Sequence, residues 1–116
     1  MSKTLLPSRG EIWLVNLNPT RGHEQAGIRP ALIVSVDIFN HGPADLIVVL
    51  PITTKNKKIP LHVKITPPEG GLKELSFIKC EDIRSISTER LLKQLGNITD
   101  STLILAEDKL RILIGL

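Results

Sequence analysis

The architecture of this chain follows most directly from residues 46–52, which read Leu46-Ile47-Val48-Val49-Leu50-Pro51-Ile52. A continuous apolar run of this length, with many β-branched residues, is typical of a buried strand. A second run of the same kind covers residues 31–36, directly after Pro30. We therefore expect two buried strands, and the sequence leaves open whether they are neighbours.

Shorter strand-like runs surround these two. Residues 61–65 alternate between apolar and polar side chains, which predicts one buried face and one face in contact with water. The connecting segments contain many Gly, Pro, Asn and Lys residues, as turns commonly do. Further strands are expected at residues 11–17, 75–80 and 83–86. Several short strands at this spacing predict a small β-barrel.

The C-terminal part of the chain predicts α-helical additions. Residues 87–90 are expected to form one helical turn. Thr99 suits a helix N-cap, Asp100 places an acid where the helix dipole favours it, and Gly115 can end the helix. Apolar residues recur between them at helical spacing: Leu103, Ala106, Leu110, Leu113 and Ile114. We expect one mainly β domain over residues 1–116, closed by an amphipathic helix that packs on the barrel or on a second subunit.

Composition limits the classes of function. The 116 residues fit one domain, and 41% hydrophobic and 23% charged residues are ordinary for a globular protein. The net charge of +3 mildly favours an anionic partner such as nucleic acid. Aromatic rings are scarce, so an aromatic platform for base stacking is hard to assemble. The rings are Trp13, Phe39 and Phe77.

The sequence also suggests a cellular compartment. Cys80 is the single cysteine, so no intramolecular disulfide can form and a reducing cytoplasm is expected. It lies in an apolar run, which favours a small core residue over a reactive thiol. Residues 1–9 contain no apolar stretch long enough for a signal peptide, and the apolar runs are far too short to span a membrane. We expect a soluble cytoplasmic protein.

Residues 18–30 concentrate polar chemistry between two apolar runs. This glycine-punctuated segment holds two arginines, a histidine, a glutamate and a glutamine. Loops that carry such groups on a rigid scaffold are common sites of binding and catalysis, and a guanidinium group matches phosphate oxygens bidentately. The alternative is a solvated hairpin loop with incidental charge.

Several kinds of catalytic site lack support in the sequence. His23, His41 and His62 lie far apart, without a metal-binding motif or a cluster of carboxylates around them. A Walker-type phosphate loop and a GxSxG motif are both absent. Covalent catalysis by Cys80 lacks an obvious partner residue. We therefore expect a cationic site without a metal ion or a cofactor.

Arg29 and Thr53 are the candidate pair for such a site. Arg29 ends the polar loop just before Pro30, and Thr53 stands where the chain leaves the apolar run 46–52. A guanidinium and a hydroxyl beside one phosphodiester could stabilise the charge that develops when RNA is cleaved. The alternatives are a surface salt bridge between Arg29 and Glu24, and an ST-turn at Thr53.

Other residues could contact the same substrate. His23 is a candidate general base, but a loop histidine that contacts substrate or solvent is the favoured interpretation. Glu24 and Gln25 could hold Arg29 in position or read base edges. Lys55, with Lys57 and Lys58 nearby, suits phosphate contacts, although a lysine-rich turn is commonly only solvated.

These segments, taken in order, resemble the MazF/PemK family of toxin endoribonucleases. The most specific is Glu24-Gln25-Ala26-Gly27-Ile28-Arg29-Pro30, within a likeness over residues 18–34. The other segments are Gly10-Glu11-Ile12-Trp13, Pro51-Ile52-Thr53-Thr54, Gly71-Leu72 with Ser76, Glu81-Asp82-Ile83-Arg84-Ser85-Ile86 and Leu113-Ile114-Gly115-Leu116. The likeness covers nearly the whole chain.

The resemblance implies an SH3-like small barrel with helical additions, acting as a homodimer. It also implies a metal-independent, sequence-selective enzyme that cuts single-stranded RNA, mostly messenger RNA. In this family the ribose 2′-hydroxyl attacks the adjacent phosphate, leaving a 2′,3′-cyclic phosphate and a 5′-hydroxyl end. A cognate antitoxin protein is expected as a partner.

Carried over by position, Arg29 matches the family's catalytic arginine and Thr53 its catalytic threonine. Substrate contacts are expected from Arg21, His23, Glu24, Gln25 and Lys55. Family members often have Ser at the position of His23, an acid at that of Asn18 and Gln at that of Asp82. These departures leave Arg29 and Thr53 intact and concern the residues that read the RNA sequence.

Two other classes of function remain as alternatives. The same barrel occurs among toxins that poison DNA gyrase by binding it, so the fold alone does not decide. An intact Arg29 and Thr53 favour the nuclease, because a gyrase inhibitor has no use for that pair. A generic RNA-binding barrel is disfavoured by the shortage of aromatic rings.

Overall fold

The two apolar runs form neighbouring antiparallel strands in the computed structural model, which describes residues 6–116. They are β2 (Ile28–Ile33) and β3 (Leu46–Thr53), and Leu32 lies opposite Leu50 in their register. On its other edge, β3 pairs first with β6 (Arg84–Ser87) and then with β5 (Ser76–Lys79). Strand β3 therefore connects the two parts of the sheet.

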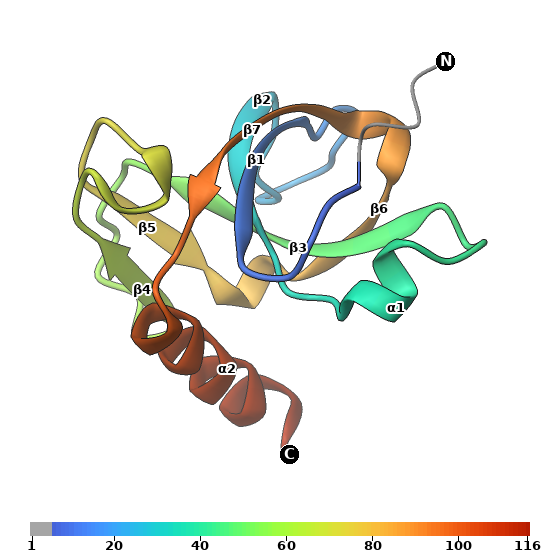
Figure 1. Cartoon of the computed structure of the whole chain (residues 1–116). Coiled ribbons are helices and arrows are strands. Elements are labelled where there is room, and N and C mark those ends of the chain that lie inside the picture. Colours follow the sequence, from blue (N-terminus) through green and yellow to red (C-terminus); the bar gives the residue numbers. More distant parts are fainter. Residues whose placement is uncertain (1–5) are drawn as a thin grey trace.

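Three more strands complete an antiparallel sheet. β1 (Glu11–Asn16) pairs with β2 and with β7 (Leu91–Asn97), and β4 (His62–Ile65) pairs with β5. The order is β4-β5-β3-β2-β1-β7, with β6 beside the first half of β3. The sheet curls into a small barrel (Figure 1). The helical elements are α1 (Asp37–Asn40), the 3-10 turns η1 (Glu69–Gly71), η2 (Cys80–Asp82) and η3 (Thr88–Arg90), and α2 (Asp100–Ile114).

The core lies on both faces of the central strands. Successive side chains of a strand point to opposite faces, so Leu32 and Leu50 enter one apolar cluster while Ala31 and Val49 enter the other. Burial on both faces explains why these strands are continuously apolar rather than alternating. The first cluster packs towards α2 and also contains Cys80, which is buried as predicted.

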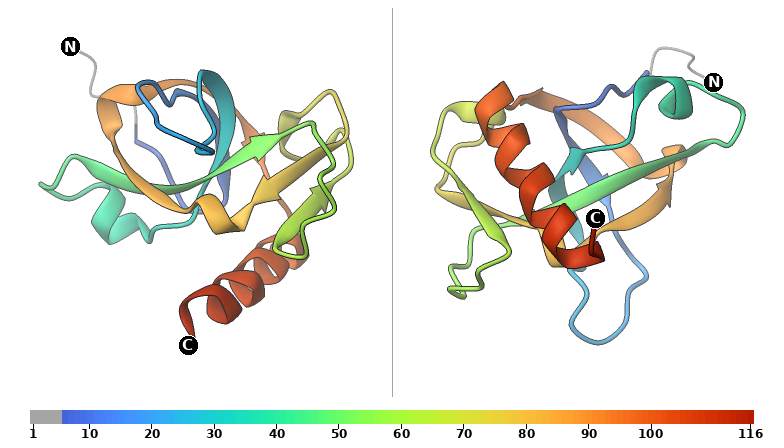
Figure 2. Two further views of the ribbon diagram at one scale, coloured as in Figure 1. Left: turned by 180° about the vertical axis from the view of Figure 1, so that it is seen from behind. Right: turned by 90° about the horizontal axis from the view of Figure 1, so that it is seen from below.

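Helix α2 begins and ends where the sequence predicts. The Thr99 hydroxyl accepts a hydrogen bond from the backbone N–H of Thr102 at 3.2 Å, and Gly115 adopts a left-handed conformation with φ 74°. The helix lies across β4 and η2, and Ala106 is buried there (Figure 2). Its last turn is exposed, with Ile112 at 70% and Ile114 at 56% of full exposure. The predicted packing on the barrel therefore holds for the helix as far as Leu110, which packs against the first cluster.

The structure adds elements that the sequence analysis did not predict. β7 is an edge strand that pairs with β1 through register shifts, and its polar residues carry no strand-like alternation. α1 is a single short turn in a segment for which no helix was predicted. β2 starts at Ile28, before Pro30, and not at residue 31. These residues form a strand because β1 pairs with them, which is information from outside the segment.

The prediction that the polar residues of 61–65 face water is wrong for His62. Lys64 is exposed and Val63 is buried, as predicted. The His62 side chain, however, is only 4% exposed, because its Nε2 atom lies 2.8 Å from Oε2 of Glu81.

Within residues 6–116, no helix is both long enough and apolar enough to cross a membrane. The expectation that no signal peptide is present concerns residues 1–9, and the first five of these lie outside the described residues.

Two backbone segments cross at unusually short range near the end of β7. A Cβ atom built on Gly71 would lie 2.0 Å from the carbonyl oxygen of Leu95, and one on Gly96 would lie 2.6 Å from the carbonyl carbon of Gly70. Gly71 also has φ 74°, which is strained for other residues. Glycine is therefore required where η1 passes over β7.

Replacement of Gly71 by alanine is expected to lower the free energy of unfolding by about 3 kcal/mol or more, because a backbone clash adds to the strain of a positive φ. Urea unfolding followed by circular dichroism measures this change. Gly10→Ala is the matched control, because Gly10 has φ 90° with open space around it. It should cost only about 1 kcal/mol. Equal losses in the two variants would contradict the close approach.

Candidate active site

The pairing of β2 with β3 brings the two candidate residues together. Ala31 lies opposite Pro51, so the same register continued by two residues sets Arg29 opposite Thr53 on one face of the sheet. Both line one surface pocket. The pocket is lined by Gln25, Arg29, Thr53, Thr54, Lys55, Lys57 and Lys79. The two strands, which the sequence alone could not place side by side, are therefore neighbours.

Thr53 ends β3 with its side chain buried at the pocket. Its Oγ1 atom accepts a hydrogen bond from the backbone N–H of Lys55 at 3.1 Å. This is the ST-turn considered as the alternative for Thr53. The turn uses one lone pair of the oxygen, so the hydroxyl hydrogen stays free to donate to a ligand. The structural and the chemical reading of Thr53 are thus compatible.

Arg29 is exposed and oriented by its own loop. Its Nε–H group donates to the carbonyl oxygen of Ala26 at 3.1 Å, which leaves the terminal nitrogens of the guanidinium to bind a ligand. The surface salt bridge between Arg29 and Glu24 is not formed within the described residues. Instead, the Glu24 carboxylate accepts the backbone N–H of Arg21 at 2.7 Å.

The polar loop is closed at its base. The backbone N–H of Gly27 donates to Oδ1 of Asn18 at 3.0 Å, and Leu17 N–H donates to the Gly27 carbonyl oxygen at 2.9 Å. The tip of the loop projects from the barrel (Figure 2). Arg21, His23 and Glu24 are exposed there and do not line the pocket. Their assignment as RNA contacts stays a prediction.

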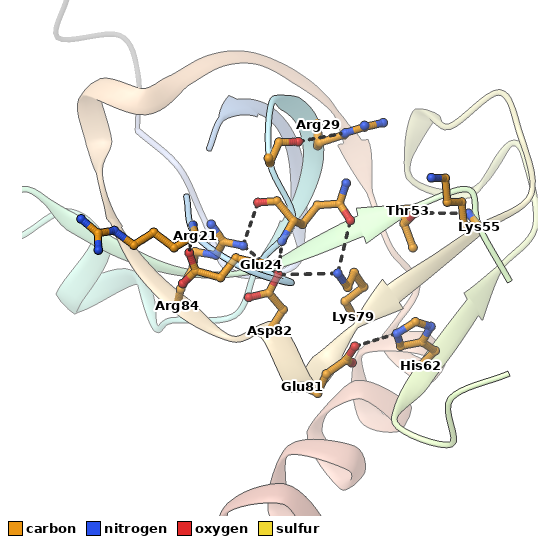
Figure 3. A network of polar contacts seen from close by, with 12 residues as sticks. Arg21, Glu24, Arg29, Thr53, Lys55, His62, Lys79, Glu81, Asp82 and Arg84 are labelled. Atoms are coloured by element: carbon orange, nitrogen blue, oxygen red, sulfur yellow. Dashed lines mark hydrogen bonds and ion pairs between the residues drawn. The ribbon is translucent and has the colours of Figure 1, made fainter. Parts of the chain in front are cut away.

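Gln25 is fixed by Asp82 at the end of η2 and by Arg84 at the start of β6. Oδ2 of Asp82 accepts the backbone N–H of Gln25 at 2.8 Å, and the Arg84 guanidinium donates to the Gln25 carbonyl oxygen at 2.9 Å. Arg84 also pairs with Asp82 at 2.7 Å (Figure 3). Together, Asp82 and Arg84 hold both backbone polar groups of Gln25. From the sequence, Asp82 stands out only as a departure from the family pattern, and Arg84 has no predicted role.

Lys79 is a pocket residue that the sequence analysis missed. It ends β5, and its Nζ atom donates to Oε1 of Gln25 at 3.3 Å and lies 3.8 Å from Oδ2 of Asp82 (Figure 3). A detectable signal existed, because Lys79 is a cation inside the apolar run 75–80. Thr54 and Lys57 also line the pocket without having been predicted as site residues.

The lining gives the pocket a positive character. Arg29, Lys55, Lys57 and Lys79 are cationic, and the other lining residues are neutral and polar. Such a surface attracts an oxyanion, and a guanidinium with a free hydroxyl can bind phosphate oxygens. Cys80 takes no part, because burial raises the pKa of its thiol to about 12. Residues 6–116 contain no group of three or more His, Cys, Asp or Glu side chains placed to hold a metal ion.

Replacement of Asp82 by alanine is expected to release Gln25, because the variant lacks the acceptor for its N–H group. Amide hydrogen exchange at Gln25 should accelerate by about tenfold or more, in line with the free energy of one buried hydrogen bond. Exchange measured by NMR tests this. Glu24→Ala is the control, since it removes the acceptor of Arg21 in the same loop. Equal protection of the Gln25 amide in both variants would show that Asp82 does not hold this residue.

Comparisons with known proteins agree on one family. Residues 8–114 match the family described as PemK-like, MazF-like toxin of type II toxin-antitoxin system. The chain is 38% identical over 109 residues to the endoribonuclease MazF9 of Mycobacterium tuberculosis, covering 90% of this chain and 92% of that protein.

Solved structures agree with the sequence match. The MazF crystal structure from Deinococcus radiodurans superposes with a TM-score of 0.85 at 29% identity, over 96% of this chain and 98% of that one. A mycobacterial endoribonuclease in complex with its cognate antitoxin has a TM-score of 0.79 at 25% identity, over 95% and 96% of the two chains. The predicted small β-barrel with a C-terminal helix is therefore confirmed.

Proposed function

The chain belongs to the family of PemK-like, MazF-like toxins of type II toxin-antitoxin systems, and from this premise we propose that the Arg29–Thr53 pocket is its ribonuclease active site. The protein is an endoribonuclease toxin whose substrate is single-stranded RNA, mainly messenger RNA. One observation carries the assignment of the site. The β2–β3 register brings a guanidinium and a hydroxyl with an unused hydrogen to one cationic pocket.

The chemistry follows from these two groups. The ribose 2′-oxygen forms a bond to phosphorus and gives up its proton to solvent water, while the bond from phosphorus to the 5′-oxygen breaks. Arg29 stabilises the negative charge on the phosphorane and supplies the proton to the departing 5′-oxygen, and the guanidinium then regains a proton from solvent water. The Thr53 hydroxyl donates to a non-bridging oxygen. The products are a 2′,3′-cyclic phosphate and a 5′-hydroxyl end.

Charge stabilisation in this scheme comes from the protein. The pocket lining holds four cationic side chains, which can offset the charge of the phosphorane. We therefore propose cleavage without a metal ion or a cofactor. Lys55 contacts a phosphate at the pocket edge, and Gln25 contacts the nucleotide beside it. Arg21, His23 and Glu24 contact the RNA farther along the projecting loop.

The gyrase inhibitor considered as an alternative has no support. The relative reported above is named an endoribonuclease, and so is the mycobacterial structural neighbour. The pocket at Arg29 and Thr53 also has no use in an inhibitor that acts by binding a protein.

The proposed partners and location follow the family. The mycobacterial neighbour was solved with its cognate antitoxin, and we propose that an antitoxin also binds and blocks the present chain. A homodimer fits the exposed apolar end of α2, at Ile112, Leu113 and Ile114. We place the protein in the cytoplasm, where its RNA substrate is found.

Purified protein is expected to cut a long single-stranded RNA at discrete sites in the presence of EDTA. Arg29→Ala should lower the rate by about 10³-fold or more, and Thr53→Val by about 10²-fold, because each removes a donor to the transition state. Primer extension maps the new ends, and end-group analysis identifies the cyclic phosphate.

Arg111→Ala serves as the control for loss of an arginine, since Arg111 lies on the exposed side of α2. It should cleave like the unmodified protein. Full activity in Arg29→Ala, or a strict requirement for a divalent metal, would refute the assigned mechanism.

Light scattering after size exclusion is expected to give about twice the chain mass of 12.8 kDa. Ile112→Asp should shift the protein towards the monomer, because it places a charge in an apolar contact. Ser101→Asp adds the same charge at an exposed position of the same helix and should stay dimeric. A monomer in the unmodified protein would show that α2 does not form a dimer contact.

A further inference from the structure

Lys79 is one of the four pocket cations, but the proposed mechanism assigns it no contact of its own with the substrate. Ile78 and Cys80 on either side of it belong to the core cluster that packs against α2. Strand alternation directs Lys79 to the opposite face, where it lines the pocket with Arg29 and Thr53. Its side chain is only 9% exposed. A buried ammonium group is costly unless its charge is compensated.

The contacts of Lys79 compensate that charge incompletely. The nearest partner is the neutral amide oxygen of Gln25, at 3.3 Å. Oδ2 of Asp82 is 3.8 Å away, beyond hydrogen-bond distance, and this same oxygen already accepts from Arg84 at 2.7 Å and from Gln25 N–H at 2.8 Å. One carboxylate thus serves two cations, so Lys79, Asp82 and Arg84 together carry one net positive charge.

The ammonium group also has donors to spare. It has three N–H bonds, and Gln25 takes one of them. The other pocket cations lie on different elements: Arg29 on β2, and Lys55 and Lys57 after β3. A phosphate in the pocket would therefore meet cationic groups from three segments of the chain. Its negative charge would supply the compensation that Asp82 gives only in part.

We propose that Lys79 forms the inner wall of a phosphate subsite and donates to the RNA phosphate held between Arg29 and Thr53. This inference rests on the proposed ribonuclease function and adds a substrate-contacting residue to it. The contact exists with bound substrate and in the transition state, so Lys79 strengthens RNA binding as well as cleavage.

The salt dependence of RNA binding tests the contact. The probe is a fluorescent RNA with the mapped cleavage sequence and a single 2′-deoxyribose at the scissile position, which removes the nucleophile. For single strands, each phosphate contact adds about 0.7 to the magnitude of the slope of log K against log salt concentration. Lys79→Met should lower that magnitude by about 0.7 and weaken binding at 50 mM salt.

Two variants make the comparison specific. Lys64→Met removes an exposed lysine of β4 outside the pocket and should leave the slope unchanged. Lys79→Arg keeps the positive charge and should therefore keep the slope. If Lys79 acted only through packing, the slope would not follow the charge at this position. NMR of the Lys79 Cε–H groups in the unmodified chain gives a readout without substitution. This signal should shift when the probe binds, while that of Lys64 stays.

The outcomes separate the two proposals. If the unmodified protein cuts RNA but Lys79→Met keeps its slope and the Lys79 signal does not move, Lys79 has no phosphate contact. If Lys79→Met cuts slowly with an unchanged slope, Lys79 only positions Gln25, and the inference is wrong. If the unmodified protein neither binds nor cuts RNA, both the ribonuclease function and the phosphate contact of Lys79 are wrong.

Discussion

Strand β3 is hydrogen-bonded along both edges, and the rest of the molecule depends on this arrangement. It pairs with β2 on one side and with β6 and β5 in succession on the other, while both of its faces are buried. A one-residue slip in the β2–β3 register would move every side chain to the wrong face. The two apolar clusters therefore fix the register, and the register fixes Arg29 opposite Thr53.

The site combines buried side chains at strand ends with a loop whose backbone is hydrogen-bonded to Asp82 and Arg84. Thr53 and Lys79 are buried at the ends of paired strands, whereas Arg29 is exposed. Within the loop that leads into Arg29, Asp82 and Arg84 bind the backbone of Gln25. The same Asp82 oxygen partly balances Lys79, so loop position and pocket charge are coupled through one carboxylate.

The central strands and helix α2 could be predicted from the sequence because the residues of each segment favour the structure that the segment forms. The buried strands are continuously apolar, and the cap residues Thr99 and Gly115 mark the ends of α2. Polar loop chemistry and the family resemblance led to Arg29 and Thr53. Strand β7 could not be predicted, since its polar residues become a strand only by pairing with β1. Lys79 was missed because its place in the pocket depends on the pairing of β5 with β3 and on its contact with Gln25, which is 54 residues away in sequence.

The most direct test of the account is a crystal structure of the unmodified protein with an RNA whose scissile ribose lacks its 2′-hydroxyl. If Arg29 and Thr53 form the active site, the scissile phosphate lies in the pocket, with oxygens within about 3 Å of the Arg29 guanidinium and the Thr53 hydroxyl. A scissile phosphate bound elsewhere on the barrel, with Arg29 and Thr53 in contact with solvent alone, would contradict this assignment.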